Sequence, residues 1–356
     1  MKINHNNFLN LAFNLAKINL GKTNLNPSVG CVVVKNDSVI SSGFTSKNGR
    51  PHAEANALSS KKNFKDSEIY ITMEPCTHYG LTPPCTNIIK KKGVRKVFYS
   101  FNDVDKRTAK KAQYVLKKKN INTHKKKSIN FNDFYNSYFI NKNYYLPFID
   151  AKIALSKDYY SINKKKKWIT NHHSRNRVHL IRSNYDSIIS TSKSINKDNS
   201  LLNCRLNGFD NNKPDLIIID LKLDIKTNLN LFNLPKQRKI LIVTSSIQNK
   251  KMSYLKKRGV KFIKLKFLKN KNDFIHLFKT LKKKGHNRIL VESGLKFLNK
   301  LLKYKLIFNL YLFKSFDKLG KEGLNNAPVN FIKRLKIFKK IKVNLNGDEL
   351  YKAKII

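Results

Sequence analysis

The tetrapeptide Pro51-His52-Ala53-Glu54 is followed further along the chain by Pro75-Cys76-Thr77-His78-Tyr79-Gly80-Leu81-Thr82-Pro83-Pro84-Cys85. These two segments contribute one imidazole, one carboxylate and two thiols. Each group alone is common, because a single His-x-Glu usually lies on the surface and two separated cysteines are often buried thiols. Together, and with a proline before the histidine and before each cysteine, they predict a Zn²⁺ site with His52, Cys76 and Cys85 as ligands.

Glu54 completes the chemistry that this pattern predicts. Three protein ligands leave the fourth zinc position to water, whose pKa falls to about 7. Glu54 is expected to be the catalytic acid and base, which moves protons from water to a ring nitrogen and to a leaving amine. His-x-Glu followed by Pro-Cys and a second Cys is typical of zinc deaminases that act on a base. The sequence therefore predicts hydrolytic deamination.

Length and cysteine usage limit the class of protein. A chain of 356 residues is expected to form two domains, which we place at 1–145 and 146–356. No apolar run is long enough for a membrane span, and residues 1–10 lack a signal-peptide core, so we expect a cytoplasmic protein without a membrane partner. Four cysteines are too few for a disulfide scaffold, and Cys31 and Cys204 are expected in the core.

The net charge of +51 has two interpretations. Clustered lysines neutralise phosphates, which would indicate a nucleic-acid-binding protein. Abundant Lys, Asn and Ile also follow from an AT-rich genome, and the lysines are spread along both halves without an aromatic-interleaved patch. We therefore do not expect nucleic acid as the partner. A field this positive still attracts anionic substrates such as sugar phosphates.

Hydrophobic patterns in the first half predict an α/β domain. Apolar residues at helical spacing predict helices at 6–18, 52–60, 85–92 and 107–118. Apolar, β-branched runs predict strands at 29–34, 39–43, 68–73 and 94–100. The third strand delivers Cys76 near its carboxyl end, where open α/β sheets place their sites. An aromatic stripe from Phe131 to Phe139 is expected to be core, and 141–146 a linker.

The second half has the pattern of another α/β domain. Strands are expected at 148–155, 187–190, 216–219, 240–243, 261–265, 288–291 and 306–313. Helices are expected at 175–182, 274–281 and 295–302. His172 and His173 begin one helix without a partner pattern, so we expect them to be exposed.

The long loop that ends in Thr82-Pro83-Pro84-Cys85 resembles one family, the bifunctional riboflavin-biosynthesis deaminase/reductases. Cytidine and tRNA adenosine deaminases usually have only two residues between their cysteines. Asn26-Pro27-Ser28-Val29-Gly30 is similar to the family's Asn-Pro-x-Val-Gly loop, whose Asn contacts the pyrimidine. The resemblance implies four deaminase substrate residues: Asn26, His78, Asp103 and Asp105.

The second half resembles the same family independently. Lys152-Ile153-Ala154-Leu155-Ser156-Lys157-Asp158, Trp168-Ile169-Thr170 and Val291-Glu292-Ser293-Gly294 look like segments of its reductase domain. The resemblance implies an NADPH site formed by Lys152, Leu155, Trp168, Thr170, Ser194, Asp198 and Gly294. It implies a reductase substrate site formed by Lys166, Arg182, Leu202, Arg205 and Glu292. A guanidinium fork suits a sugar phosphate, although a lone Trp is usually core.

The resemblance also implies the fold and the reactions. We expect a cytidine-deaminase-like three-layer α/β/α domain followed by a dihydrofolate-reductase-like α/β domain. The first would use Zn²⁺ to deaminate a diaminopyrimidinone ribosylamine 5′-phosphate, and the second NADPH to reduce the ribosyl group to ribityl. The partner would be this small pyrimidine ribosyl phosphate. The sequence is also compatible with a homo-oligomer.

Several positions depart from the family's pattern and leave alternatives open. Leu81 stands where the family usually has Lys or Arg, and Thr45 where it often has His. In the reductase half, Tyr159, Thr191 and Ser293 replace Gly of the family pattern, Ser200 replaces Pro, and Lys166 replaces a substrate-contacting Ser. Because Gly allows close backbone approach to a dinucleotide, a deaminase with an inactive reductase domain is one alternative. A basic RNA-binding or RNA-editing deaminase is another.

Overall fold

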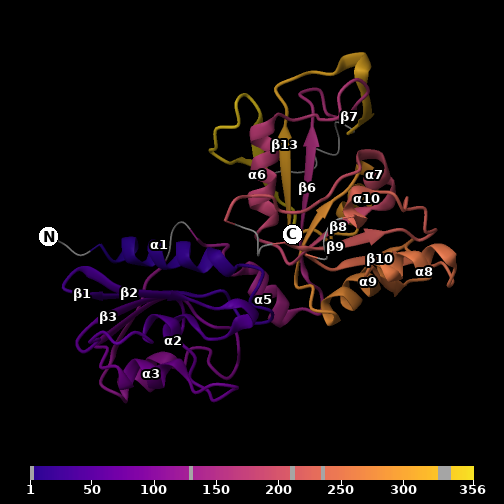
Figure 1. The fold of residues 1–356 in the computed structure, drawn as a ribbon. Coiled ribbons are helices and arrows are strands. Elements are labelled where there is room, and N and C mark those ends of the chain that lie inside the picture. The colour runs from indigo at the N-terminus through magenta and orange to yellow at the C-terminus, as the bar shows by residue number, and fades with distance from the viewer. Residues whose placement is uncertain (1–3, 128–130, 209–212, 234–236, 328–337) are drawn as a thin grey trace. The chain divides into compact units, whose positions relative to one another are not determined.

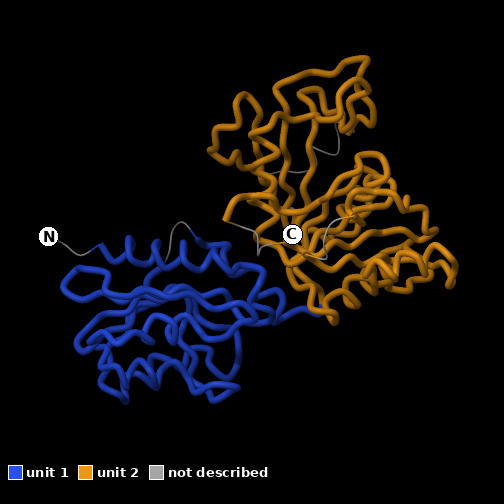
Figure 2. The backbone as a smooth tube through the Cα atoms, viewed as in Figure 1, with its two compact units in different colours: residues 1–145 blue, residues 146–356 orange. Residues whose placement is uncertain are grey.

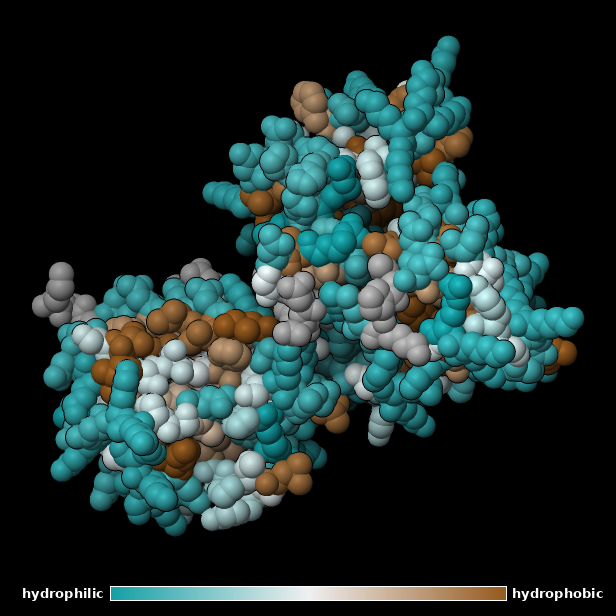
Figure 3. Space-filling model, in the orientation of Figure 1, coloured by the Kyte–Doolittle hydropathy of each residue, from teal (hydrophilic) through white to brown (hydrophobic). Residues whose placement is uncertain are grey.

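The computed structural model describes residues 4–127, 131–208, 213–233, 237–327 and 338–356. The chain divides into two compact units, Met1–Tyr145 and Leu146–Ile356 (Figure 2). Hydrophilic side chains cover most of the face seen in Figure 3, as the high charge requires. Within the described ranges, no helix combines the length and the apolar character that crossing a bilayer demands.

In its described residues, unit 1 has a sheet of five strands with short helices on both sides of it (Figure 1). Its elements are α1 (His5–Ala16), η1 (Lys17–Asn19), β1 (Gly30–Lys35), β2 (Ser38–Phe44), η2 (Lys47–Gly49), α2 (Ala53–Ala57), β3 (Glu68–Met73), α3 (Cys85–Lys91), β4 (Lys96–Phe101), α4 (Ala112–Lys117), β5 (Asn122–Lys125) and α5 (Asn136–Asn143). The strand order is β2-β1-β3-β4-β5. The pairs β3–β4 and β4–β5 are parallel, whereas β1 is antiparallel to both of its neighbours.

Alternate residues of β1 face opposite sides of the sheet, and both sides are buried. Val32 and Val34 pack with Leu9 and Ala12 of α1. Cys31 and Val33 belong to the cluster on the other side, which also contains residues of α2 and α3. A strand buried on both faces has a continuous apolar sequence, which the run at 29–34 shows. The expected three-layer α/β/α arrangement is confirmed.

The helix expected at 107–118 is wrong in its first turn and begins only at Ala112. Lys110 adopts a left-handed conformation with φ of 61°, which interrupts a right-handed helix. The backbone N–H groups of Lys110 and Ala112 donate to the Glu74 carboxylate instead of to helical carbonyls. Tertiary hydrogen bonds therefore override the local helical pattern.

Unit 2 is built on a sheet of nine strands in the order β11-β10-β9-β8-β12-β6-β13-β16-β15, with a two-stranded β14-β7 sheet beside it. The strands are β6 (Phe148–Leu155), β7 (Tyr160–Asn163), β8 (Ser187–Thr191), β9 (Asp215–Ile219), β10 (Ile240–Thr244), β11 (Lys261–Lys264), β12 (Arg288–Glu292), β13 (Asn309–Lys314), β14 (Gly323–Asn326), β15 (Phe338–Lys340) and β16 (Glu349–Lys354). The helices are α6 (His172–Arg182), α7 (Ser192–Asp198), η3 (Asn230–Phe232), α8 (Lys250–Lys257), α9 (Lys271–Lys283), α10 (Leu295–Lys303) and η4 (Gly320–Glu322).

The pairs from β11 to β13 are parallel, and β16 is antiparallel to β13. Helices α9 and α10 cover one face, where Phe274 and Leu298 share a core with Ile217 of β9. Helices α6 and α8 cover the other face, where Val178 and Leu255 pack with the next strand residue, Ile218. The expected α/β class of this half is confirmed, whereas the sequence missed α7, α8 and the short strands β7 and β14–β16.

Gly30 offers a direct test of the packing between α1 and β1. A Cβ at Gly30 would lie 1.8 Å from the carbonyl oxygen of Ala12, which is impossible without moving the helix. We expect Gly30→Ala to destabilise unit 1 by about 3 kcal/mol, measured as a lower urea midpoint. The control is Gly294→Ala, where the new Cβ would meet only Ser194 Oγ at 3.8 Å. Equal stability of the two variants would contradict this packing.

Candidate active sites

The predicted zinc ligands converge at one end of the unit 1 sheet. His52 Nδ1 lies 3.4 Å from Cys85 Sγ and 3.7 Å from Cys76 Sγ. A tetrahedral zinc ion with bonds of about 2.1 Å to nitrogen and about 2.3 Å to sulfur separates such atoms by roughly 3.6 Å. Among the residues that the structure describes, these three form the one group of His, Cys and acidic side chains close enough to hold a metal. The donor set therefore fits Zn²⁺.

Secondary structure explains this convergence. His52 is the N-cap of α2, Cys85 is the first residue of α3, and Cys76 follows the carboxyl end of β3. The Cys85 backbone N–H donates to Cys76 Sγ over 3.1 Å. The hydrogen bond from the Cys85 thiol is the largest of the effects that lower the pKa of Cys76, this backbone bond adds to it, and both favour the thiolate. A thiolate is the form of cysteine that binds metal.

Glu54 lies inside the same site without being one of the three converging donors. It is on the first turn of α2, two residues after His52, and only 4% of its surface is exposed. Burial, and then the negative charge of Cys76, raises the pKa of Glu54 to about 7. A carboxyl group that gains and loses its proton near neutral pH suits a proton shuttle.

The four expected deaminase substrate residues all lie in loops of unit 1, outside its helices and strands. Asn26 Nδ2 donates to the Gly49 carbonyl at 2.9 Å, and His78 Nδ1 lies 2.9 Å from Thr108 Oγ1. Asp103 accepts from the Tyr138 hydroxyl at 2.8 Å.

Asp105 is more strongly engaged, because Arg107 donates to it through Nε at 2.9 Å and Nη2 at 2.6 Å. Those hydrogen bonds hold the pKa of Asp105 well below its usual range. Both aspartates thus have structural partners, and their contact with substrate stays a prediction.

Glu74 is a residue that sequence reasoning missed. Its carboxylate is buried and accepts the backbone N–H groups of Asp103, Lys110 and Ala112 at 3.0–3.1 Å. The loop after β4 is thereby fixed beside the end of β3, where Thr108 meets His78. The sequence did contain one sign of this role: Glu74 is an acidic residue directly after an apolar strand, and acidic residues are rarely buried unless they are paired.

A buried ion cluster occupies the carboxyl ends of β12 and α6 in unit 2. Arg182 forms a bidentate pair with Glu292, through Nε at 2.6 Å and Nη2 at 3.0 Å. Lys152 Nζ is 3.9 Å from Glu292 Oε2. Burial alone would raise the pKa of Glu292, but the charge and hydrogen bonds of Arg182 outweigh burial and lower it. Glu292 is therefore ionised, as a partner for two cations must be.

The loop after α7 joins this cluster to Arg205. Arg182 Nη1 donates to the Asn203 carbonyl at 2.9 Å, and Arg205 Nη1 donates to the Asn203 side chain at 2.8 Å. Leu202 is buried and left-handed, with φ of 48°. Arg238, which the sequence did not reveal, donates from Nη1 to the Leu202 carbonyl at 2.6 Å and also bonds Leu201 and Pro214. This buried guanidinium holds the loop that presents Arg205.

The expected cofactor residues are only partly brought together. A Cβ on Gly294, at the start of α10, would lie 3.8 Å from Ser194 Oγ of α7, so these two helix starts are neighbours. Burial raises the pKa of Asp198, and the positive charges of Lys197, Lys167 and Lys152 oppose this shift. Ser293 Oγ is buried and has no hydrogen-bond partner among the described residues. Room for a side-chain atom at Gly294 and an unpaired hydroxyl at Ser293 fit a polar cofactor such as NADPH.

Other residues of the predicted reductase site make different contacts. Trp168 is 49% exposed with Lys167 and Arg175 near its ring, so the interpretation as core is wrong. The Thr170 carbonyl accepts from Arg175, and the Lys166 backbone N–H donates to Asn163. Leu155 is fully buried.

The remaining expectations for single residues concern burial. Cys31 and Cys204 are buried as expected. His172 and His173 are exposed, also as expected.

Of the three positions at which the sequence replaces a family glycine, only Tyr159 needs a glycine-like backbone. Its φ is 69°, the left-handed region that costs a non-glycine residue about 1–2 kcal/mol. Thr191 has an ordinary extended conformation and caps α7 by accepting the Ser194 N–H. Ser293 is not among the residues with positive φ. The loss of glycine therefore strains the backbone at Tyr159. At Thr191 and Ser293 it only adds side-chain atoms that occupy space.

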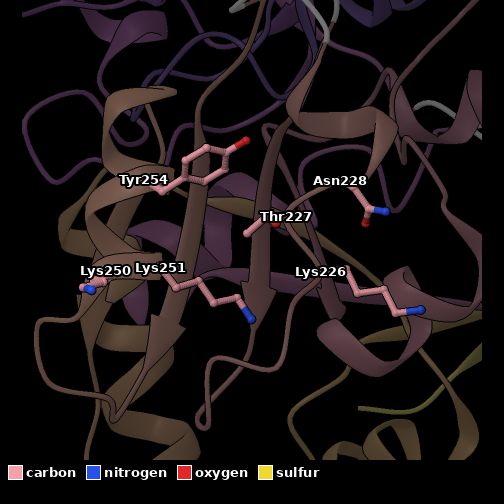
Figure 4. Close-up of a pocket in the computed structure, with 6 residues that line it drawn as sticks. All are labelled: Lys226, Thr227, Asn228, Lys250, Lys251 and Tyr254. Atoms are coloured by element: carbon pink, nitrogen blue, oxygen red, sulfur yellow. The ribbon is translucent and has the colours of Figure 1, made fainter.

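A separate surface hollow of about 600 Å³ in unit 2 is lined by Lys226, Thr227, Asn228, Lys250, Lys251 and Tyr254 (Figure 4). None of these residues belongs to the predicted cofactor or substrate sites. Lys251 Nζ already donates to the Leu223 carbonyl at 2.6 Å, and the side chains of Lys226 and Lys250 point away from one another. The hollow therefore lacks the convergent polar groups of a ligand site.

Comparison with known proteins matches each unit to a family. The model of the cytidine and deoxycytidylate deaminase zinc-binding region matches residues 2–101. The model of the RibD C-terminal domain matches residues 147–315. A riboflavin biosynthesis protein RibD from Buchnera aphidicola is 34% identical over 333 residues, which cover 88% of this chain and 87% of the relative. The chain belongs to the RibD family. Members of the RibD family are bifunctional deaminase/reductases of riboflavin biosynthesis.

Further members of the RibD family match nearly the whole chain. RibD from Aquifex aeolicus is 29% identical and covers 96% of both chains. A structure of RibD from Acinetobacter baumannii superposes with a TM-score of 0.80 at 25% identity and covers 99% of both chains. A deaminase/reductase structure from Thermotoga maritima gives the same TM-score at 23% identity. The expected cytidine-deaminase-like and dihydrofolate-reductase-like domains are thus confirmed as folds.

The metal site is tested by exchanging single thiols. We expect Cys76→Ser to lower bound zinc from about one per chain to nearly none after dialysis, because a hydroxyl does not ionise near neutral pH and is a poor zinc ligand. Zinc would be measured by mass spectrometry of the purified protein. Cys31→Ala, at a buried cysteine of β1, is the control and is expected to retain the metal. Full zinc content in Cys76→Ser would refute this ligand assignment.

Proposed function

We propose that this chain catalyses two consecutive reactions on a pyrimidine ribosyl phosphate. The first is hydrolytic deamination of a 2,5-diamino-6-ribosylamino-pyrimidinone 5′-phosphate in unit 1. The second is NADPH-dependent reduction of the ribosyl group to a ribityl chain in unit 2. The observation that carries the proposal is the convergence of His52, Cys76 and Cys85 around a buried Glu54, in a chain whose second unit matches the RibD C-terminal domain.

Deamination requires a nucleophile and a moving proton. His52, Cys76 and Cys85 would hold Zn²⁺, which makes bound water acidic enough to supply hydroxide at neutral pH. Glu54 Oε would accept one proton from water and give it to the ring nitrogen; a second proton, from the hydroxyl added to the ring carbon, would then pass through Glu54 to the departing amine. Burial of Glu54 keeps its proton affinity high enough for both transfers. Water adds, ammonia leaves, and the ring carbon becomes a carbonyl.

Reduction requires that sugar and cofactor be held side by side. NADPH supplies the hydride. Gly294 lies beside Ser194 where two helix starts meet, and the Ser293 hydroxyl is available as a donor. Arg182 and Arg205 would bind the anionic sugar phosphate, with Arg182 oriented by Glu292, which also pairs with Lys152 of the cofactor site. The negative charge of ionised Glu292 offsets the repulsion between its two cationic neighbours, Arg182 and Lys152.

Glu54→Gln separates metal binding from proton transfer. We expect the variant to keep its zinc, because Glu54 is not a ligand, and to lose ammonia release by at least about 100-fold. Ammonia would be measured in a coupled assay, with zinc content measured on the same sample. Substantial activity in this variant would show that the proton-shuttle role is wrong.

Arg182→Lys tests the second unit alone. Lysine cannot reproduce the guanidinium fork that binds Glu292 while also reaching the Asn203 carbonyl. We expect substrate-dependent NADPH oxidation to fall by more than about 10-fold, with ammonia release unchanged. Arg258→Lys is the matched control, because Arg258 bonds Asn233 at the surface, away from the ion cluster. Loss of both activities would indicate unfolding rather than a reductase defect.

Two rival functions have distinct outcomes in these assays. A deaminase with an inactive reductase domain, suggested by the strained Tyr159, predicts ammonia release without measurable NADPH binding. An RNA-editing deaminase, suggested by the charge of +51, predicts tight RNA binding that weakens steeply with salt.

The proposal includes the cellular location and the oligomeric state of the enzyme. We place it in the cytoplasm, where its thiols stay reduced. Self-association to a homo-oligomer would be measured by light scattering.

A further inference from the structure

Arg50 lies beside the zinc site without a role in the chemistry described above. Its Nη1 atom is 2.9 Å from Thr82 Oγ1 and 3.2 Å from His52 Nε2. Thr82 belongs to the loop between the two cysteine ligands, so one guanidinium spans from that loop to the histidine ligand. Arg50 is only half-buried, which leaves part of its fork accessible from solvent.

Zinc binding changes what Arg50 can bond. His52 turns Nδ1 toward both sulfur atoms, so the metal would take that nitrogen. A neutral imidazole that uses Nδ1 as a ligand carries its proton on Nε2. Nε2 and the guanidinium are then both donors, and their 3.2 Å contact is no longer a hydrogen bond. In the described part of the chain, no carboxylate pairs with Arg50 to replace it.

A second donor faces Arg50 across Gly80. A Cβ on Gly80 would lie 3.8 Å from Arg50 Nη2 and 3.8 Å from His78 Nε2. The two nitrogens are therefore separated by no more than twice that distance, with only a glycine between them. Hydrogen bonds of about 2.8 Å to two oxygens of one phosphate can bridge such a gap. His78 is pre-oriented for this, because Thr108 holds its other nitrogen at 2.9 Å.

Leu81 and Thr45 supply no competing charge. Leu81, in the same loop, is 87% exposed and apolar. The buried Thr45 hydroxyl oxygen accepts the Val29 N–H at 3.0 Å, so that side chain is engaged inside unit 1. Arg50 is thus the cation that directly adjoins both a zinc ligand and the cysteine loop.

We propose that Arg50 and His78 form an anion clamp across Gly80 that holds the 5′-phosphate of the deaminase substrate. The inference rests on the proposed function of unit 1 and names the residues that select a phosphorylated substrate. Arg50 supplies the fixed charge, and His78 supplies a second, directional donor. The clamp places the phosphate beside the cysteine loop and so sets how the pyrimidine approaches Glu54.

The first experiment compares phosphorylated and dephosphorylated substrate with the zinc-loaded full-length enzyme. For Arg50→Gln we expect KM of the phosphorylated substrate to rise about 10- to 100-fold, as for loss of a hydrogen bond to a charged group, with kcat changed by less than about 3-fold. With the dephosphorylated substrate, Arg50→Gln and wild type should behave alike. An equal KM increase for both substrates, or loss of zinc, would mean that Arg50 only positions His52 and would overturn the clamp.

Two further variants separate local from overall charge. Arg95→Gln is the matched control: Arg95 is exposed and precedes β4, at the end of the strand opposite the zinc ligands. It removes the same charge and should leave both KM values unchanged. Adding Leu81→Lys to Arg50→Gln returns a cation to the cysteine loop and should restore at least about a third of the lost affinity. No recovery, together with an effect of Arg95→Gln, would show that only the overall charge matters.

A binding measurement distinguishes failure of the clamp from failure of the proposed function. The His78 imidazole signal, identified by its loss in His78→Gln, should shift in NMR spectra of the zinc-loaded enzyme when ribose 5-phosphate is added. It should not shift with ribose, nor with ribose 5-phosphate in Arg50→Gln. This result without ammonia release would keep the clamp and refute the deaminase substrate. Ammonia release with an unresponsive His78 would refute the clamp alone.

Discussion

Parallel strand pairing brings the carboxyl ends of neighbouring strands to one edge of a sheet, and both units place their polar groups there. In unit 1, β3 and β4 run in parallel, so Cys76 and Asp103 follow strands that end side by side. In unit 2, β8 and β12 run in parallel, so Thr191 and Glu292 are neighbours at the same edge. The direction of the paired strands therefore determines at which edge of the sheet a functional site can form, whichever side chains are present.

Buried charges then fix the loops that follow those strands. Glu74 accepts three backbone N–H groups from the segment after β4 and so closes that loop against the zinc site. Arg238 has the corresponding role in unit 2, where it donates to carbonyls of the loop that carries Arg205. Both groups are satisfied by backbone rather than by a counter-ion. This arrangement compensates a buried charge while it rigidifies the chain around a site.

The departures from the family pattern differ in their consequences for the structure. Tyr159 occupies a left-handed backbone conformation that glycine would adopt without strain, yet its ring packs against the core, with Lys314 over it. Thr191 uses its hydroxyl to cap a helix. Leu81 is exposed and loses only a charge, which Arg50 is placed to supply from a different segment.

The amino-acid sequence by itself determined the zinc donor set, the order of most helices and strands, and the two-sided burial of strands such as β1. These features depend on residue type and on spacing within short segments, two of them for the zinc donors, which local chemistry specifies. Only the tertiary structure decided that α4 begins late, that Trp168 is exposed, that Glu74 and Arg238 hold loops, and that Arg50 meets Thr82. Apart from the exposure of Trp168, each of these depends on groups that are distant in the chain and meet only after the sheet has formed, so no local pattern encodes them.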